Sequence, residues 1–205
     1  MSESLLDEER AARGLRVDTS IADWRAGLRA DLDGTFEQGA GKWSRAIAAV
    51  AWIHLGCFLF CQAIYQPDVQ RDPRHFYVWV AEFFAVLVAL RAIAGPGWIR
   101  SSAAIGVAAR LWITFLILSF NVLSLNELTG WDTRWYRPVW ATLSTFMLAS
   151  MAWLFSLRLF VLAVQMYFTG LLMLYFKHFD NLIYGVSWWL ALMAISLRIR
   201  TRERT

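Results

Sequence analysis

Charged residues are scarce in this chain of 205 residues: they make up 18% of it, against about 25% in a typical soluble domain. Hydrophobic residues reach 58%, above the roughly 45–50% of soluble domains. A core of this size cannot bury all 12 Trp and 14 Phe side chains, so many of them must face lipid. The composition excludes an ordinary soluble domain and predicts an integral membrane protein.

The chain also lacks the common catalytic motifs. It contains no H-E-x-x-H, no G-x-S-x-G, no Walker A and no G-x-G-x-x-G sequence. Its only cysteines, Cys57 and Cys61, are four residues apart and do not form a C-x-x-C redox pair. The pI of about 9.4 reflects arginines placed around membrane spans, not a nucleic-acid surface. We therefore expect a non-enzymatic protein with no nucleic-acid partner.

Proline is rare too, and all four prolines lie between apolar runs or at the start of one. A helix of about 20 residues crosses a bilayer core. Six runs are long enough: about 44–65, 76–95, 103–124, 139–157, 159–176 and 182–198. We expect a turn near Ser156–Arg158, because 139–176 as one helix would be far too long for one crossing. The predicted fold is an all-α polytopic bundle with six spans; five is the alternative, because the short last run could be re-entrant.

Residues 1–41 are predicted to form an acidic cytosolic region, followed by the transmembrane bundle over 42–198 and a basic tail over 199–205. The first 40 residues hold nine acidic and five basic side chains, which excludes a secretory signal peptide. A capping box beginning at Ser20 predicts an amphipathic helix over 20–38. Its apolar stripe is Ile21, Trp24, Leu28, Leu32 and Phe36. We expect this helix to pack on the bundle or the membrane surface, with docking of a partner as the alternative.

Basic residues predict the orientation of the spans. With six spans, the side that holds both termini carries nine basic residues and the other side carries five. The positive-inside rule then predicts a multi-pass protein of the cell (inner) membrane with both termini in the cytoplasm. We also expect an interfacial belt of tryptophans, including Trp43, Trp98 and Trp140, at the span ends.

Polar residues within the spans are the candidate functional residues, because hydrocarbon makes them costly. His54, Cys57 and Cys61 share one helix face, and Glu82 lies at a similar depth on the next span. Together they could ligate zinc or copper. The alternative is a His54–Glu82 hydrogen bond with buried thiols, and His54 could also ligate a tetrapyrrole. We predict no cofactor, and the metal and the tetrapyrrole stay open as alternatives.

A second group lies on the third span. Ser102 and Gly106 form a small-residue stripe suited to helix packing, and this stripe ends at Arg110. His54, Glu82, Arg110 and Asn121 are the residues that would line an ion path. The function we expect is a homo-oligomeric ion channel. The alternative is a structural or cofactor-holding anchor subunit of a respiratory or photosynthetic type of membrane complex. The expected partners are membrane lipid and either further copies of the chain or unlike subunits.

Overall fold

The computed structural model describes the backbone of residues 3–65, 73–129 and 133–202, and in these ranges it contains helices and no strand. Side-chain surroundings are described for residues 20–65, 74–126, 128 and 137–201. The long helices are α1 Glu3–Ile64, α2 Pro73–Ala94, α3 Ala103–Thr129, α4 Thr133–Leu154, α5 Phe160–Tyr175 and α6 Asp180–Arg202. Three short 3-10 helices connect them: η1 Trp98–Arg100, η2 Leu157–Leu159 and η3 Lys177–Phe179.

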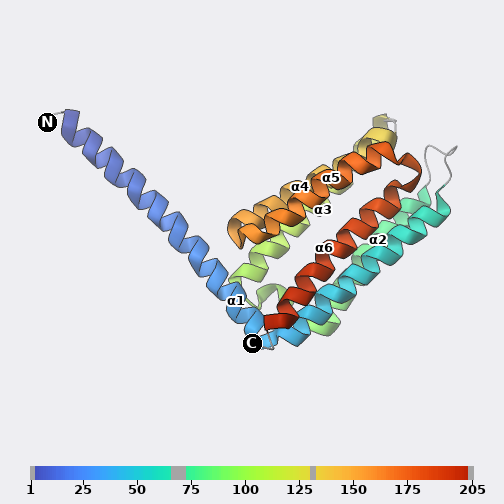
Figure 1. Cartoon of the computed structure of the whole chain (residues 1–205), viewed down its shortest axis with the longest axis horizontal. Helices are drawn as coiled ribbons and strands as arrows, with labels where there is room; N and C mark the ends of the chain where they lie inside the picture. The colour runs from blue at the N-terminus through green and yellow to red at the C-terminus, as the bar shows by residue number, and fades with distance from the viewer. Residues whose placement is uncertain (1–2, 66–72, 130–132, 203–205) are drawn as a thin grey trace.

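The long helices form two layers of three (Figure 1). In one layer α1 packs along α6 and α2, and in the other α4 packs along α5 and α3. The layers meet where α5 lies on α6 and α1 lies on α3, whereas α2 and α3 pack only loosely in the described part of the chain. We call the end of the bundle at Gly39, η1, η2 and the end of α6 the terminal end. The opposite end holds Tyr65 and the starts of α2, α4 and α6.

Five stretches are long and apolar enough to cross a membrane: Ser20–Ile64, Arg74–Ala94, Ala103–Asn126, Leu157–Tyr175 and Lys177–Thr201. The predicted all-α membrane bundle is confirmed. We expected the last run to be the uncertain span, but α6 has 23 residues and is long and apolar enough to cross a membrane. Helix α4 is the one that does not meet this criterion. Hydroxyl groups make α4 less apolar, yet each donates to the carbonyl four residues earlier, which satisfies it within the helix. These residues are Thr142, Ser144, Thr145 and Ser150.

Helix α1 bends at Gly39, whose backbone is not helical (φ −143°, ψ 32°). Its N-terminal half turns away from the direction of the other helices (Figure 1). The helix runs through Ser20 without interruption, so the helix start expected there is wrong. Leu28 is buried against Ala104 and Phe155, whereas Ile21 and Trp24 are exposed. The predicted apolar stripe therefore packs on the bundle through only part of its length.

Asp31 fixes the N-terminal half of α1 to the bundle. One carboxylate oxygen of Asp31 accepts a hydrogen bond from the backbone N–H of Ala104, at 2.8 Å. Ala104 lies in the first turn of α3, where backbone N–H groups have no partner within the helix. The carboxylate thus caps α3 from another part of the chain, and its charge is favourable at a helix N-terminus.

The remaining boundaries agree with the sequence in part. The turn predicted near Ser156 is present, with Ser156 in an extended conformation between α4 and η2. Pro138 lies within α4 and not in its first turn, because the helix begins at Thr133. Trp43 and Trp140 are buried in the core and do not belong to an interfacial belt. The loops at 66–72 and 130–132 and the end of the tail at 203–205 lie outside the described residues.

Helices α1 and α6 approach closely because small residues lie between them. Ala51 and Ala191 are fully buried. The Ser44 and Ser196 hydroxyl oxygens are 3.0 Å apart, and the Ser196 hydroxyl also donates to the Ser44 carbonyl at 2.8 Å. A Cβ atom added to Gly185 would lie 2.5 Å from the Cβ of Phe58. Close packing at these small residues fixes α1 against α6 in the first layer.

We expect Gly185→Ala to destabilise the bundle, because the new methyl group forces α6 away from Phe58. Overpacking of this kind costs about 1–3 kcal/mol. The midpoint of thermal unfolding in mild detergent should fall. Gly56→Ala is the matched control, since a Cβ there meets nothing within 4 Å. Equal midpoints for the two variants would show that the α1–α6 contact is not tight.

The orientation of the bundle is testable with reporter fusions. We expect reporters fused at Ser2 and Thr205 to report the cytoplasm. The sequence predicts outer loops at 66–74 and 125–137, and within them reporters inserted in the connections 66–72 and 130–132, between the helices, should report the outside. The reason is the excess of basic residues on the side of the termini. Termini on opposite sides of the membrane would contradict six crossings.

Candidate functional site

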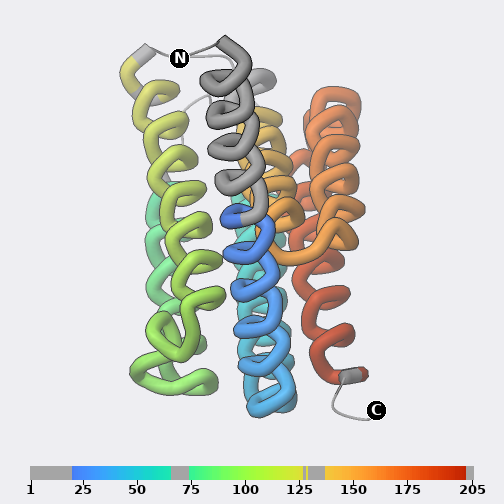
Figure 2. The backbone as a smooth tube through the Cα atoms, turned by 90° about the vertical axis from the view of Figure 1, so that its left-hand side faces the viewer, coloured from blue at the N-terminus to red at the C-terminus, as the bar shows by residue number. Residues whose placement is uncertain are grey.

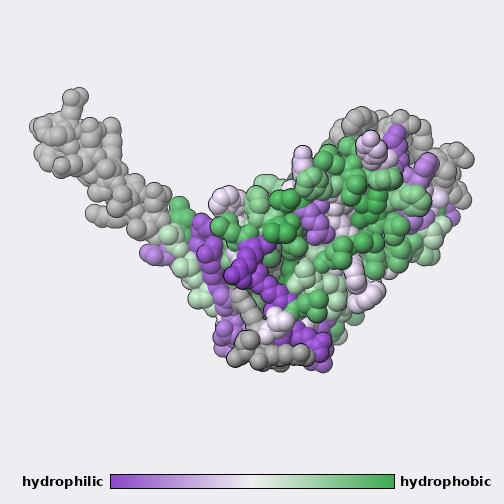
Figure 3. Space-filling model, viewed as in Figure 1, coloured by the Kyte–Doolittle hydropathy of each residue, from purple (hydrophilic) through white to green (hydrophobic). Residues whose placement is uncertain are grey.

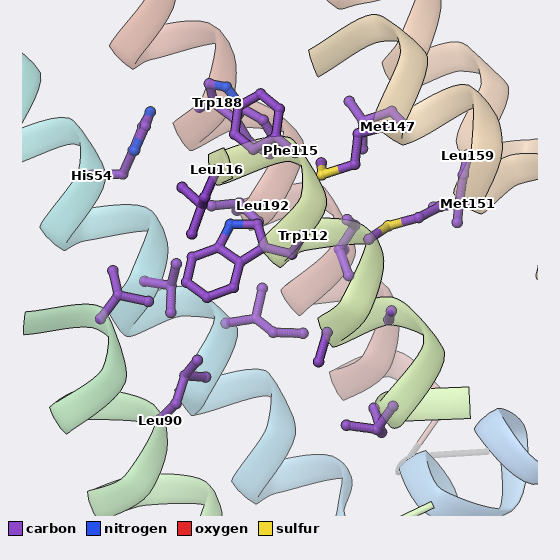
Figure 4. A pocket seen from close by; sticks show the side chains of 18 of the residues that line it. His54, Leu90, Trp112, Phe115, Leu116, Met147, Met151, Leu159, Trp188 and Leu192 are labelled. Carbon is purple, nitrogen blue, oxygen red and sulfur yellow. The ribbon is translucent and has the colours of Figure 1, made fainter. Parts of the chain in front are cut away.

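A cavity of about 800 Å³ lies between the two layers, and we call it the central cavity. This volume is within the roughly 300–1,000 Å³ of small-molecule sites. Its walls are mainly aliphatic and aromatic side chains from every long helix except α5. Figure 4 shows side chains from six elements around this space: His54, Leu90, Trp112, Phe115, Leu116, Met147, Met151, Leu159, Trp188 and Leu192.

The central cavity is elongated along the helices. Its lining residues on α3 run from Ile105 to Leu123, which corresponds to roughly 27 Å along the helix at 1.5 Å per residue. An extended hydrocarbon chain can lie along this length in contact with the apolar walls.

His54 on α1 and Glu82 on α2 face each other in the wall of the central cavity. The Nδ1 atom of His54 forms a hydrogen bond with Oε1 of Glu82, and their side chains are only 17% and 13% exposed. The imidazole also contacts the rings of Phe58, Tyr184 and Trp188. Its Nε2 atom is buried and has no hydrogen-bond partner in the described part of the chain. When Nδ1–H donates to the carboxylate, Nε2 becomes an acceptor or a ligand atom.

The four residues proposed as metal ligands do not come together as a set. Among the described residues, no three His, Cys, Asp or Glu side chains are grouped in a way that could hold a metal ion. The Glu82 carboxylate is hydrogen-bonded to His54. Both cysteines are free, and Cys61 is fully buried. The structure has the His54–Glu82 hydrogen bond of the alternative, and of the two thiols Cys61 is buried whereas Cys57 is half-buried.

The polar residues of α3 lie apart from this pair. Arg110 and Asn121 are exposed on the outer surface of the bundle and do not line the central cavity. Ser102 caps α3, because its hydroxyl accepts the N–H of Ile105 at 3.2 Å. Gly106 packs against η1, since a Cβ there would lie 3.4 Å from the carbonyl oxygen of Ile99. The small-residue stripe thus packs at the turn before α3. The close contact between helices that we expected at this stripe is found between α1 and α6.

Charged residues line the central cavity at the terminal end. Arg29 and Asp33 come from α1, Arg158 from η2 and Arg198 from α6. Figure 3 shows hydrophilic side chains gathered at this end, whereas hydrophobic ones cover most of the visible face of the bundle. The Nε atom of Arg29 is buried without a hydrogen-bond partner in the described residues. The central cavity therefore has a cationic end and an apolar body.

A buried ion pair lies at the opposite end. The Nη1 atom of Arg137 donates to both carboxylate oxygens of Asp180, at 2.7 and 2.6 Å. The backbone N–H of Asn181 also donates to this carboxylate, and the guanidinium lies 4.8 Å from the centre of the Tyr65 ring. Arg137 lies just before the span predicted at 139–157. The signal that sequence reasoning missed was an Arg and an Asp that begin two different apolar runs.

At the same end, Gln62 links α1 to η3 and α6. The side-chain amide of Gln62 donates to the carbonyl of His178 at 2.6 Å, and its oxygen accepts the N–H of Leu182 at 3.3 Å. Nearby, Nε2 of His75 lies 3.2 Å from the carbonyl oxygen of Cys61. None of these residues lines the central cavity, so a polar layer separates it from this end.

The chain matches no known protein family, no curated protein and no solved structure at a significant level. The function is therefore inferred from the geometry of the bundle and its cavity alone.

Arg137→Gln alone should destabilise the protein strongly, because it leaves the Asp180 charge buried without its partner. Breaking such a pair typically costs about 3–5 kcal/mol. The double variant Arg137→Gln/Asp180→Asn should recover much of the lost thermal midpoint in detergent, since no unpaired charge remains. Arg91→Gln, at an exposed site of the terminal end, is the control. If the double variant is no more stable than Arg137→Gln, the two charges are not coupled.

Proposed function

We propose that this protein holds a lipophilic molecule in the central cavity, within the membrane, and is not an enzyme. The observation that carries the proposal is an elongated space of about 800 Å³ whose walls are almost entirely apolar and aromatic. The walls of an apolar space of this size, which is partly open to the outside of the bundle, forgo much dispersion energy unless something fills it. A molecule with a long hydrocarbon part would restore these contacts.

This proposal is closest to the ligand-holding alternative, and it has more support than an ion channel. Only two of the four residues proposed for an ion path, His54 and Glu82, line the central cavity. Arg110 and Asn121 are exposed on α3. An ion would have to leave its water for a wall of Leu, Met, Phe and Trp side chains, which is costly. A path built from several copies of the chain would need a different surface.

His54 gives the lipophilic molecule one polar contact. Its unpartnered Nε2 atom can accept a hydrogen bond from a hydroxyl group, or ligate the metal of a tetrapyrrole. Glu82 would hold the imidazole in the orientation that keeps Nε2 available.

We propose the cell (inner) membrane as the location, with both termini in the cytoplasm, on the basic residues at the terminal end. The exposed side chains of Val88, Ile117, Phe146 and Val161 suit a lipid surface. They equally suit contact with further copies of the chain or with unlike subunits of a complex.

Protein purified in mild detergent should retain a lipophilic molecule, detectable by native mass measurement and identifiable after solvent extraction. Ala108→Phe should reduce the retained amount about tenfold or more, because the ring fills space that the ligand needs. Ala92→Phe, on the exposed face of α2, is the matched control. The absorption spectrum separates a pigment from a colourless lipid.

The contrary result is equally clear. Wild-type protein that retains nothing, and that conducts ions in proteoliposomes with a conductance altered by Glu82→Gln, would favour the channel and overturn the proposal.

A further inference from the structure

The charges that line the central cavity are distributed unevenly along it. The terminal end holds three arginines, Arg29, Arg158 and Arg198, and one carboxylate, Asp33. Along the rest of the lining in the described residues, the only ionisable side chain besides His54 and the Tyr184 phenol is Glu82. Since Glu82 is bonded to His54, the terminal end is the only part of the cavity with excess positive charge. A ligand with a negative head and an apolar tail would match both parts.

The arginines that line the terminal end come from different elements. Arg29 comes from α1, Arg158 from η2 and Arg198 from α6, so three separate elements converge on the cavity. The buried Nε of Arg29 lacks a hydrogen-bond partner within the described chain, which leaves a donor for an incoming anion. A guanidinium forms paired, charge-assisted hydrogen bonds with phosphate oxygens. Arg91 and Arg100 lie near the same end but do not line the cavity.

The bundle also offers a route from the bilayer. Helices α2 and α3 both line the central cavity but pack only loosely against each other in the described part of the chain. Ring contacts span the space between them: Phe76 with Phe120, and Phe83 with Trp112, at centroid distances of 6.3 Å. Aromatic side chains can change rotamer and move aside, whereas the backbones of two closely packed helices cannot. A molecule already in the bilayer could therefore enter sideways between these helices without passing through water.

From these observations we infer that the occupant is an anionic phospholipid of the surrounding membrane. Its phosphate lies between Arg29, Arg158 and Arg198, and an acyl chain extends along α3 towards His54. This inference rests on the proposed function and adds the class of ligand. The terminal end lies at one end of the apolar helices, the place where phospholipid heads would lie in a membrane, and the body of the cavity runs along these helices, the place of the acyl chains. Charge complementarity selects the anionic members of this class.

The test uses the full-length protein in nanodiscs of mixed phosphatidylcholine and phosphatidylglycerol. A small fraction of either lipid carries a photoreactive group in its acyl chain, and mass spectrometry locates the labelled residues. We expect the phosphatidylglycerol probe to label the cavity residues Leu116 and Met147 about fivefold more than the phosphatidylcholine probe. Labelling of the lipid-facing residues Val88 and Ile117 should be the same for both probes, which makes them internal controls.

Two pairs of variants complete the design. Arg29→Gln and Arg158→Gln should each reduce cavity labelling by phosphatidylglycerol roughly tenfold, the value of one charged hydrogen bond. Arg91→Gln and Arg100→Gln should leave it unchanged. These substitutions affect partly or fully exposed side chains, and the lipid-facing labels verify that each variant is folded.

The outcomes separate this inference from the proposed function. Equal cavity labelling by the two probes, with no effect of the arginine variants, would overturn the choice of an anionic lipid but leave a lipophilic occupant in place. Labels confined to the lipid-facing residues for both probes, with no lipophilic molecule retained on purification, would overturn both.

Discussion

A polar group within hydrocarbon must find its partner inside the protein, and this constraint determines how the helices of the bundle are joined. At each level of the bundle a polar contact links two helices: Ser44 with Ser196, His54 with Glu82, and Arg137 with Asp180. In α4 the hydroxyl groups bond back to their own helix, and that of Ser144 also bonds to the Tyr184 hydroxyl on α6 at 2.8 Å. Lipid offers no hydrophobic force between helices, so these contacts and close packing set the register between them. Figure 2 shows the long helices side by side along the bundle.

The same contacts explain why a cavity can persist. At the opposite end, the pair Arg137–Asp180 links α4 to α6, that is, one layer to the other. At the terminal end, Asp31 links α1 to the first turn of α3. The layers are thus attached at both ends, and Trp112 and Trp188 line the space between these attachments. We expect the polar links to oppose collapse of the cavity.

The sequence predicted the helical architecture well because hydrophobic length and breaks are local properties. The turn at Ser156 and the bend at Gly39 could both be read from neighbouring residues. The partner of a side chain is not a local property. His54 and Glu82 were paired correctly because they are the only groups of their kind at similar depth on adjacent spans. Arg137 and Asp180 were missed because 43 residues separate them and each resembles an ordinary flanking charge.

The tryptophans show why the cavity itself could not be predicted from the sequence. At the end of an apolar run, Trp140 looks like an interfacial anchor, yet it is buried beside Tyr184 and Trp79 and lines the cavity. Periodicity says that a side chain is apolar, but not whether lipid, another helix or an empty space lies beside it. That distinction depends on how far apart two layers are held, which is decided by contacts between distant residues. The same holds for the arginines. The sequence does not show which of Arg29 and Arg100 lies at a cavity, and only the fold places Arg29 at the end of an apolar one.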